Sequence, residues 1–343
     1  MAESVAESAA ESVAESASHV RPFRFAVQTT TAKSATEWRD LARRVESAGY
    51  STLFLADHYI GPGPVSARTL LRPQHLAPIA AMAAAAAWTT TLRVGCRVFC
   101  IDYHVPAALA KEAATIDLLS DGRLEFGIGA GTNQGEYEAM GLTFHDAPKR
   151  VSKLEEVVAL VKAHWSGEPI DVHGEHVNVS GYAGLPVPAQ QPRPRILIGG
   201  AKKRVLSLAA READIVSMSN VGWTPRNDAG LTPAEEARRR YAVVREAAGS
   251  RFDALELESS PYLVAVTDDP DATLERWSAN LRKALPEAGP DLLRHHPNVL
   301  AGSAEEIIDR LQERRETTGI NYITIPRKHM EEFAPIVAKL TGR

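Results

Sequence analysis

The sequence predicts a closed (β/α)8 barrel, an α/β fold in which parallel strands alternate with helices. Short apolar segments alternate with amphipathic segments of helical period eight times between residues 24 and 326. The chain has 343 residues and is 44% hydrophobic, which is enough for one large core. The glycine-rich segment GIGAGTNQG (127–135) lacks the third glycine of a dinucleotide-binding fingerprint. A doubly wound open sheet remains the competing fold.

The first 20 residues contain a four-residue repeat that predicts a disordered acidic tail. Its glutamates at 3, 7, 11 and 15 would place four like charges on one face of a helix. Their four negative charges account for the whole formal net charge of −4. The balanced remainder gives no electrostatic footprint for nucleic acid or an anionic membrane. No Lys or Arg precedes Arg21 and no long apolar run is present, so neither a secretory signal nor a transit peptide is expected. We expect a cytoplasmic protein.

Four strand and helix units are expected in the first part of the chain. The helix after the first strand has Trp38, Leu41 and Val45 at helical spacing, and Gly49 supplies its stop. The first four strands are expected at RFAVQ (24–28), STLFLAD (51–57), LRVGCRVF (92–99) and RLEFGIGAG (123–131). The helices that follow the last three are expected before Trp88, at 106–122 and around 136–140.

An insertion at about 142–194 is expected before strand five. It contains a helix at 151–165 and a two-stranded ribbon within 169–182 that turns at 173–175, and it ends in a proline-rich run. Strands five to eight are then expected at RILIGG (195–200), ADIVSMS (213–219), LELESSPYLVAV (255–266) and INYITIP (320–326), with one helix between the last two. The expected organisation is the tail, 1–20, followed by one barrel domain, 21–343.

The two cysteines, Cys96 and Cys100, fall in one predicted strand. Four residues of extended chain would separate them by about 13 Å, which is too far for a disulfide.

Asp57 and His58 lie at the carboxyl end of the second predicted strand, where a barrel carries its chemistry. An imidazole can exchange protons near neutral pH, so His58 is a candidate acid or base, while Asp57 could orient a loop or a ligand. Because adjacent strand residues point to opposite sides, only one of the two is expected to face the cavity. The alternative is a pair that merely caps the next loop.

Gly95, Cys96 and Arg97 interrupt the third predicted strand. A strand glycine often marks a bulge or a close backbone approach, and a buried arginine needs partners. The alternative is an Arg97 that is simply held by a carboxylate in the core.

Gly129 and Gly131, followed by Thr132, Asn133 and Gln134, lie at the carboxyl end of the fourth strand. Glycine lets a flat ligand approach the backbone without a clash with Cβ. A tight turn with an Asn cap explains the same residues equally well.

Gly199, Gly200 and Ala201 lie where the fifth strand meets a helix that begins with Lys202, Lys203 and Arg204. The positive end of a helix favours a phosphate, whereas a purely structural helix would avoid three cations there. We therefore expect a phosphate-binding turn. The sequence has no convincing set of metal ligands, no G-x-S-x-G nucleophile motif and no P-loop, so no metal site is expected.

Taken together, four segments resemble the luciferase-like monooxygenase superfamily, and within it the branch of oxidoreductases that use the deazaflavin coenzyme F420. They are LFLADHY, RVGCRVFCIDYHVPAALAKEAATIDLLSDGRLEFGIGAG, EYEAMGLTFHDAPKRVSKLEE and ILIGGAKKRVLSLAAREADIV. The resemblance runs from about Arg24 to Pro326. It implies a barrel of the bacterial luciferase type with an insertion before strand five, usually dimeric, that holds a flavin or deazaflavin ring at its C-terminal mouth.

The resemblance also implies roles for the residues at the strand ends. Asp57 and His58 would lie beside the ring, with His58 as the acid or base on the substrate side. Cys96 and Arg97 match a strand bulge behind the ring, which often contains a non-proline cis peptide. The remaining cofactor-binding positions implied are Gly129, Gly131, Thr132, Asn133, Gln134, Gly199, Gly200 and Ala201, and Lys202 would add charge near the cofactor tail.

Two positions depart from the pattern of the relatives. Sugar-phosphate dehydrogenases of this kind carry a glutamate proton donor where this chain has Thr132, which cannot act as that acid at neutral pH. Many relatives have a further glycine where this chain has Lys202. Oxidation of a sugar phosphate is therefore not expected.

The expected function is hydride transfer between F420 and a small organic substrate. His58 would accept or donate the accompanying proton. One alternative is an FMN-dependent monooxygenase that takes reduced flavin from a separate reductase and uses oxygen. Another is a barrel that binds a flavin without turning it over. The substrate would meet the loops at 59–74, 219–232 and 285–297, and its identity does not follow from the sequence.

Overall fold

The computed structural model of the protein describes residues 21–69, 73–218 and 221–343. The predicted tail at 1–20 lies outside the described residues, as do small parts of two of the predicted substrate loops, 70–72 and 219–220. In the described ranges, no helix combines the length and the apolar character that crossing a membrane requires.

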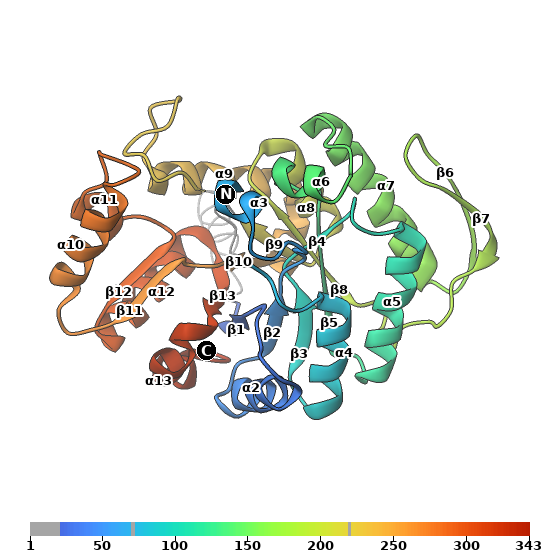
Figure 1. Ribbon diagram of the computed structural model, residues 1–343, viewed down its shortest axis with the longest axis horizontal. Helices are drawn as coiled ribbons and strands as arrows, with labels where there is room; N and C mark the ends of the chain where they lie inside the picture. Colours follow the sequence, from blue (N-terminus) through green and yellow to red (C-terminus); the bar gives the residue numbers. More distant parts are fainter. Residues whose placement is uncertain (1–20, 70–72, 219–220) are drawn as a thin grey trace, which may run out of the picture.

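Eight parallel strands close into a barrel, which confirms the predicted fold and excludes the open sheet (Figure 1). β1 pairs with β13 on one side and β2 on the other, and β3 pairs with β5, so the ring has no free edge. The strands, in the order of the ring, are β1 (Arg24–Gln28), β2 (Thr52–Leu55), β3 (Arg93–Cys96), β5 (Leu124–Gly129), β8 (Arg195–Gly200), β9 (Ile215–Met218), β10 (Glu256–Ser259) and β13 (Ile320–Pro326).

Helices surround the barrel, and side chains fix where several of them begin. Ser34 and Asp146 each accept a hydrogen bond from the first turn of their helix, and Thr232 and Ser303 form capping boxes with a glutamate three residues on. The main helices around the barrel are α2 (Ala35–Ser47), α4 (Pro78–Trp88), α5 (Pro106–Leu119), α7 (Ala147–Trp165), α8 (Lys203–Glu212), α9 (Pro233–Ala248), α12 (Ala304–Thr318) and α13 (Met330–Leu340). Two short helices, α3 (Pro64–Thr69) and α6 (Gln134–Ala139), lie at the mouth end.

The third predicted strand is broken by a bulge. β3 ends at Cys96, and the two residues of β4 (Phe99–Cys100) continue the pairing with β5. The peptide bond between Arg97 and Val98 is cis, as the family resemblance implied for this position. Cys96 and Cys100 are buried and free, in agreement with the prediction that they form no disulfide.

The predicted ribbon is present as the antiparallel pair β6 (Pro169–His173) and β7 (Asn178–Ala183). The carboxylate of Glu156 on α7 accepts the backbone N–H groups of Glu175, His176 and Val177, which fixes the turn of the ribbon against the helix. The assignment of 142–194 as an insertion stays a prediction.

The prediction of one strand over 255–266 is wrong. Only β10 belongs to the barrel, because the chain breaks at Ser260 and Pro261, and proline cannot donate to a central ladder. β11 (Leu263–Val266) instead pairs in parallel with β12 (Val299–Gly302) in a separate small sheet, visible at the left of Figure 1. Two further helices, α10 (Pro270–Leu281) and α11 (Pro290–Arg294), lie between these strands in the sequence.

The interior of the barrel is a packed core. Ala26, Phe54, Leu197, Ile215 and Tyr322 fill its middle. Towards the N-terminal ends of the strands, the buried Glu125 carboxylate pairs with the guanidinium of Arg24 and accepts the hydroxyl of Tyr322 at 2.8 Å. Among the described residues of the barrel interior, room for a ligand is therefore left at the carboxyl ends of the strands.

Candidate functional site

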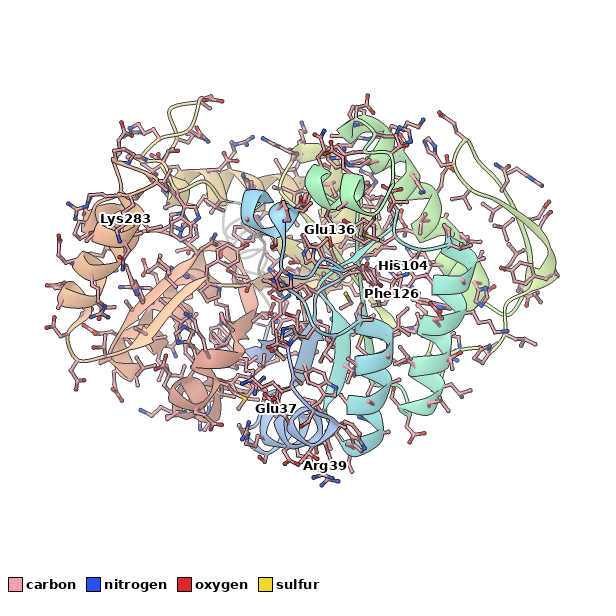
Figure 2. All side chains as sticks on the ribbon, in the orientation of Figure 1. Glu37, Arg39, His104, Phe126, Glu136 and Lys283 are labelled. Carbon is pink, nitrogen blue, oxygen red and sulfur yellow. The ribbon has the colours of Figure 1, made fainter. Side chains whose placement is uncertain are left out.

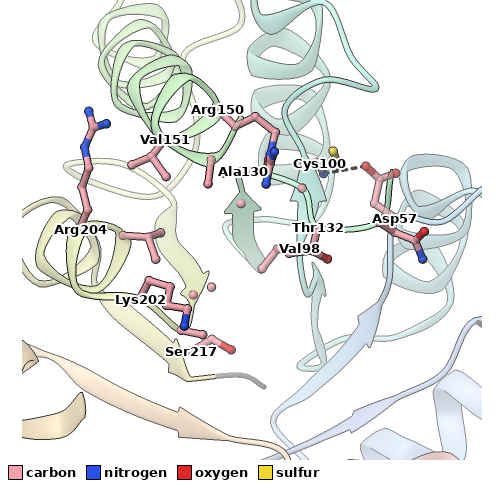
Figure 3. A pocket seen from close by; sticks show the side chains of 18 of the residues that line it. Asp57, Val98, Cys100, Ala130, Thr132, Arg150, Val151, Lys202, Arg204 and Ser217 are labelled. Carbon is pink, nitrogen blue, oxygen red and sulfur yellow. Dashed lines mark hydrogen bonds between the residues drawn. The ribbon is translucent and has the colours of Figure 1, made fainter. Parts of the chain in front are cut away.

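A cavity of about 620 Å³ opens at the carboxyl ends of β2, β4, β5, β8 and β9; we call it the main cavity (Figure 3). Loops far apart in the sequence converge on it, as the barrel topology requires. Eleven of the residues predicted from the sequence line the cavity: Asp57, His58, Arg97, Gly129, Gly131, Thr132, Asn133, Gly199, Gly200, Ala201 and Lys202. Their roles stay predictions.

Two of the predicted cofactor-binding residues lie outside the lining. Cys96 has no exposed surface and belongs to the hydrophobic core. Gln134 is the first residue of α6, and its amide donates a hydrogen bond to Glu138 at 2.8 Å along the same helix. Neither side chain faces the main cavity.

Asp57 and His58 both line the main cavity, so the expectation that only one would do so is wrong. The reason is that β2 ends at Leu55, and strand alternation no longer applies at 57 and 58. The Oδ2 atom of Asp57 accepts hydrogen bonds from the backbone N–H of Cys100 and from Nε2 of His104, both at 2.9 Å. Its Oδ1 atom is buried and has no partner in the described part of the chain.

The imidazole of His58 is held by the carboxylate of Glu136. Nδ1 of His58 lies 2.7 Å from Oε2 of Glu136, while Oε1 accepts the backbone N–H of Tyr59 at 2.8 Å. The Glu136 side chain is fully buried, whereas that of His58 is 30% exposed. Burial would raise the pKa of Glu136, but the hydrogen bonds from His58 and Tyr59 lower it overall. An ionised carboxylate accepts Nδ1–H, so Nε2 carries the lone pair of the neutral ring.

Sequence reasoning missed Glu136 because helix capping already accounted for a glutamate at this position. Asn133 caps α6 and accepts the backbone N–H of Glu136, which places Glu136 where a capping-box carboxylate is normally found. The Glu136 side chain turns to His58 instead. The spacing N-x-x-E was the signal, but only the tertiary structure shows what the carboxylate contacts.

Arg97 lines the main cavity and pairs with a buried carboxylate. Its Nε donates to Oε2 of Glu258 at 2.9 Å, and Ser217 donates to the same oxygen at 2.6 Å. Burial would lower the pKa of Arg97, yet the adjacent carboxylate of Glu258 raises it overall. The reading of Arg97 as an arginine held by a core carboxylate is thus confirmed, and the same residue also lines the cavity. Val98, the next residue of the bulge, was not predicted and lines it too.

Packing within the protein already requires the glycines of the β5 loop. A Cβ on Gly129 would lie 2.8 Å from Val98, and one on Gly131 would lie 2.0 Å from the hydroxyl of Tyr137. Gly131 also has a φ of +72°, which disfavours other residues. These glycines let the bulge and the loop meet closely beside the cavity.

The predicted phosphate turn lies where β8 meets α8. No side chain caps the start of α8, and its N-cap residue, Lys202, lines the main cavity. Lys203 is exposed and lies outside the lining. Arg204 also lines the cavity, but its guanidinium is engaged with Pro148 O, Ser152 and Glu155 of the neighbouring helix. Lys202 is therefore the cation of this turn that is best placed for an anionic ligand.

Comparison with known proteins points to one family. The family model described as luciferase-like monooxygenase matches residues 17–322. An FMNH2-dependent dimethylsulfone monooxygenase of Pseudomonas putida is 31% identical over 109 residues, which cover 32% of this chain and 30% of that enzyme. The match therefore spans only about a third of this curated relative.

Two solved structures share the fold at low sequence identity. The F420-dependent tetrahydromethanopterin reductase from Methanopyrus kandleri superposes with a TM-score of 0.71 at 15% identity, covering 94% of this chain and 100% of that one. An EDTA monooxygenase from Chelativorans sp. BNC1 superposes with a TM-score of 0.72 at 16% identity, covering 93% and 94%. At this identity the likeness shows the fold alone. With the family model matching most of its length, the chain belongs to the luciferase-like monooxygenase family.

Proposed function

We propose that the protein is an oxidoreductase that transfers a hydride between coenzyme F420 and a small organic substrate. The observation that carries the proposal is His58, which faces the main cavity with Nδ1 held by Glu136 and Nε2 left to a ligand. This arrangement suits a step in which a proton moves together with the hydride.

The residues around the main cavity fit a flavin-type group. Val98, Ala130 and Val151 give an apolar lining suited to a flat ring. The buried Oδ1 of Asp57 has no partner in the described chain, and it could accept an N–H or O–H of the ring or of the substrate. At the other end, Lys202 and the start of α8 suit a phosphate on the tail.

A bound flavin-type ring would supply the redox chemistry. The chain's own residues would position substrate and proton. Nε2 of His58 accepts a proton from a substrate hydroxyl in the oxidative direction and returns it in the reductive direction. Glu136 fixes the orientation of the imidazole and stabilises its protonated form, as a carboxylate does for a catalytic histidine. Glu136 is therefore a positioning residue.

An FMN-dependent monooxygenase is the second candidate. The stretch that is 31% identical to an FMNH2-dependent enzyme favours it, because the F420-dependent neighbour supports the fold alone. A homodimer is also proposed, as is a separate reductase if FMN is the cofactor.

Parallel fluorescence titrations with F420 and FMN, followed by turnover assays, test the proposal. We expect the tighter dissociation constant for F420, and its oxidation or reduction with a small alcohol or carbonyl compound under anaerobic conditions. Oxygen-dependent consumption of reduced FMN would replace the first candidate with the second. Tight binding of either ring without any turnover would instead indicate a binding protein and would overturn both enzymatic proposals.

A further inference from the structure

A second cavity, of about 400 Å³, lies beside the main one; we call it the side cavity. It is bounded by the loop before α7, by the first turns of α7 and by the turn of the β6–β7 ribbon. Its lining is Asp102, Leu142, Thr143, His145, Lys149, Arg150, Lys153, Glu175 and His176. Arg150 lines both cavities and forms the wall between them.

The wall and the turn are held in place by specific contacts. The guanidinium of Arg150 donates to the carbonyl oxygens of Ala130 and His145 and stacks on the ring of Phe144, with 3.9 Å between Cζ and the ring centroid. The three backbone bonds to Glu156 hold the ribbon turn, which brings His176 to the cavity. The side cavity is thus a built feature rather than a gap between loops.

The side cavity carries more positive than negative charge after its lining residues that pair with one another are set aside. The carboxylate of Asp102 already accepts Lys153 Nζ at 2.5 Å and the hydroxyl of Tyr137 at 2.8 Å. Lys149 forms no ion pair with any described residue, and the contacts of Arg150 are to carbonyl oxygens and an aromatic ring. Two cations and two histidines, His145 and His176, therefore face only Glu175.

We propose that the side cavity is a binding site for an anion, a carboxylate or a phosphate, with Lys149 and Arg150 as its main ligands. The anion has two possible sources. It can be the outer end of the ligand whose ring occupies the main cavity, in which case the inference rests on the proposed function. It can also be a free anion that binds independently. Guanidinium and ammonium groups without carboxylate partners recognise both chemistries.

Lys149→Glu is the variant that tests the site. Lys149 is exposed, and its backbone N–H, rather than its side chain, contacts the capping Asp146. A glutamate in the first turn of a helix also suits the helix dipole, so the variant is expected to fold. Lys283→Glu is the matched control, because it reverses the charge of an exposed lysine on the far side of the molecule (Figure 2).

The measurement is calorimetric titration of the full-length protein at low salt with four probes. Two are free anions, citrate and inorganic phosphate; the others are F420 and the same deazaflavin without its anionic tail. We expect Lys149→Glu to raise the dissociation constant for citrate or phosphate about tenfold. Lys283→Glu should keep the wild-type dissociation constant. If the anion is the outer end of the main ligand, F420 binding also weakens while the tail-less form is unaffected. An effect on free anions alone assigns the site to an independent anion.

Unchanged binding of citrate, phosphate and F420 by Lys149→Glu would overturn the proposal. Failure of the proposed function looks different. In that case neither deazaflavin probe binds the wild-type protein, yet the free anions still distinguish Lys149→Glu from Lys283→Glu. His176→Ala is a second variant for the same titrations. It shortens the wall of the side cavity that lies opposite α7, and it leaves the charge of α7 unchanged.

Discussion

The Nδ1 atom of His58 and the Oε2 atom of Glu136 lie 2.7 Å apart, although 78 residues separate them in the sequence. The loop after β2 and the short helix α6 meet at the mouth of the barrel to make this contact. Because the carboxylate is buried and ionised, it selects one tautomer of the imidazole. The pair therefore defines which ring nitrogen faces the ligand.

Replacing Glu136 with Gln should lower turnover by about 10² to 10⁴, because an amide can donate to Nδ1 and so favour the wrong tautomer. Binding of the ring should change little, since Glu136 does not line the main cavity. Steady-state kinetics alongside fluorescence titration separate the two effects. Glu138→Gln, an exposed glutamate on the same helix, is the control. Equal kcat values for the two variants would remove the positioning role of Glu136.

Replacing His58 with Asn should abolish most turnover while the affinity for F420 or FMN is preserved. Loss of a general acid or base typically costs about 10² to 10⁴ in rate. His295→Asn is the control, since the side chain of His295 is 71% exposed and does not line the main cavity. Wild-type turnover in His58→Asn would contradict the proposed mechanism.

Local pattern was enough to predict the barrel. Apolar runs and helical spacing are encoded within each strand and helix, and parallel strands then gather their carboxyl ends at one rim. The small sheet escaped prediction because β12 (Val299–Gly302) pairs with β11, and β11 had been assigned to the preceding barrel strand. The break after β10 was signalled by Pro261, but the apolar run that follows it reads as a continuation of the strand.

The part of the site that lies at the carboxyl ends of the strands could be predicted from the sequence. Gly129 and Gly199 lie at the carboxyl ends of β5 and β8, and Asp57 comes two residues after β2, so their position was given by the topology. Glu136 and Arg150 come from helices whose contacts with other loops depend on tertiary packing. No local spacing in a single sequence identifies such partners.

Replacing Lys202 with Ala should weaken binding of a phosphorylated cofactor by about three- to tenfold, because an ion pair at an exposed lysine contributes only about 1 kcal/mol. Lys203→Ala is a stringent control, because the two lysines are adjacent and only Lys202 lines the main cavity. Titration with FMN and with riboflavin, which lacks the phosphate, isolates the effect. If Lys202→Ala weakens FMN and riboflavin equally, the cation acts on something other than the phosphate.

Glu46 gives a stability prediction that is independent of the site. Its Oε1 accepts the backbone N–H groups of Thr90, Thr91 and Leu92 at 2.8, 2.6 and 3.0 Å, just before β3. Burial would raise the pKa of Glu46, but these hydrogen bonds lower it to about 2. A carboxyl whose pKa is lower in the folded state than in the unfolded state, where it is about 4.3, stabilises the fold above that value. The contribution is lost as the pH falls towards 2.

Glu46→Gln should therefore cost about 1 kcal/mol of unfolding free energy at pH 7, a modest value because the site is partly open to solvent. At pH 3 the wild-type carboxyl has lost part of this advantage, so the difference between the two proteins should shrink. Urea unfolding at pH 7 and pH 3 measures both quantities, with the exposed Glu287→Gln as control. A difference that stays constant between the two pH values would show that the charge of Glu46 is not what stabilises the start of β3.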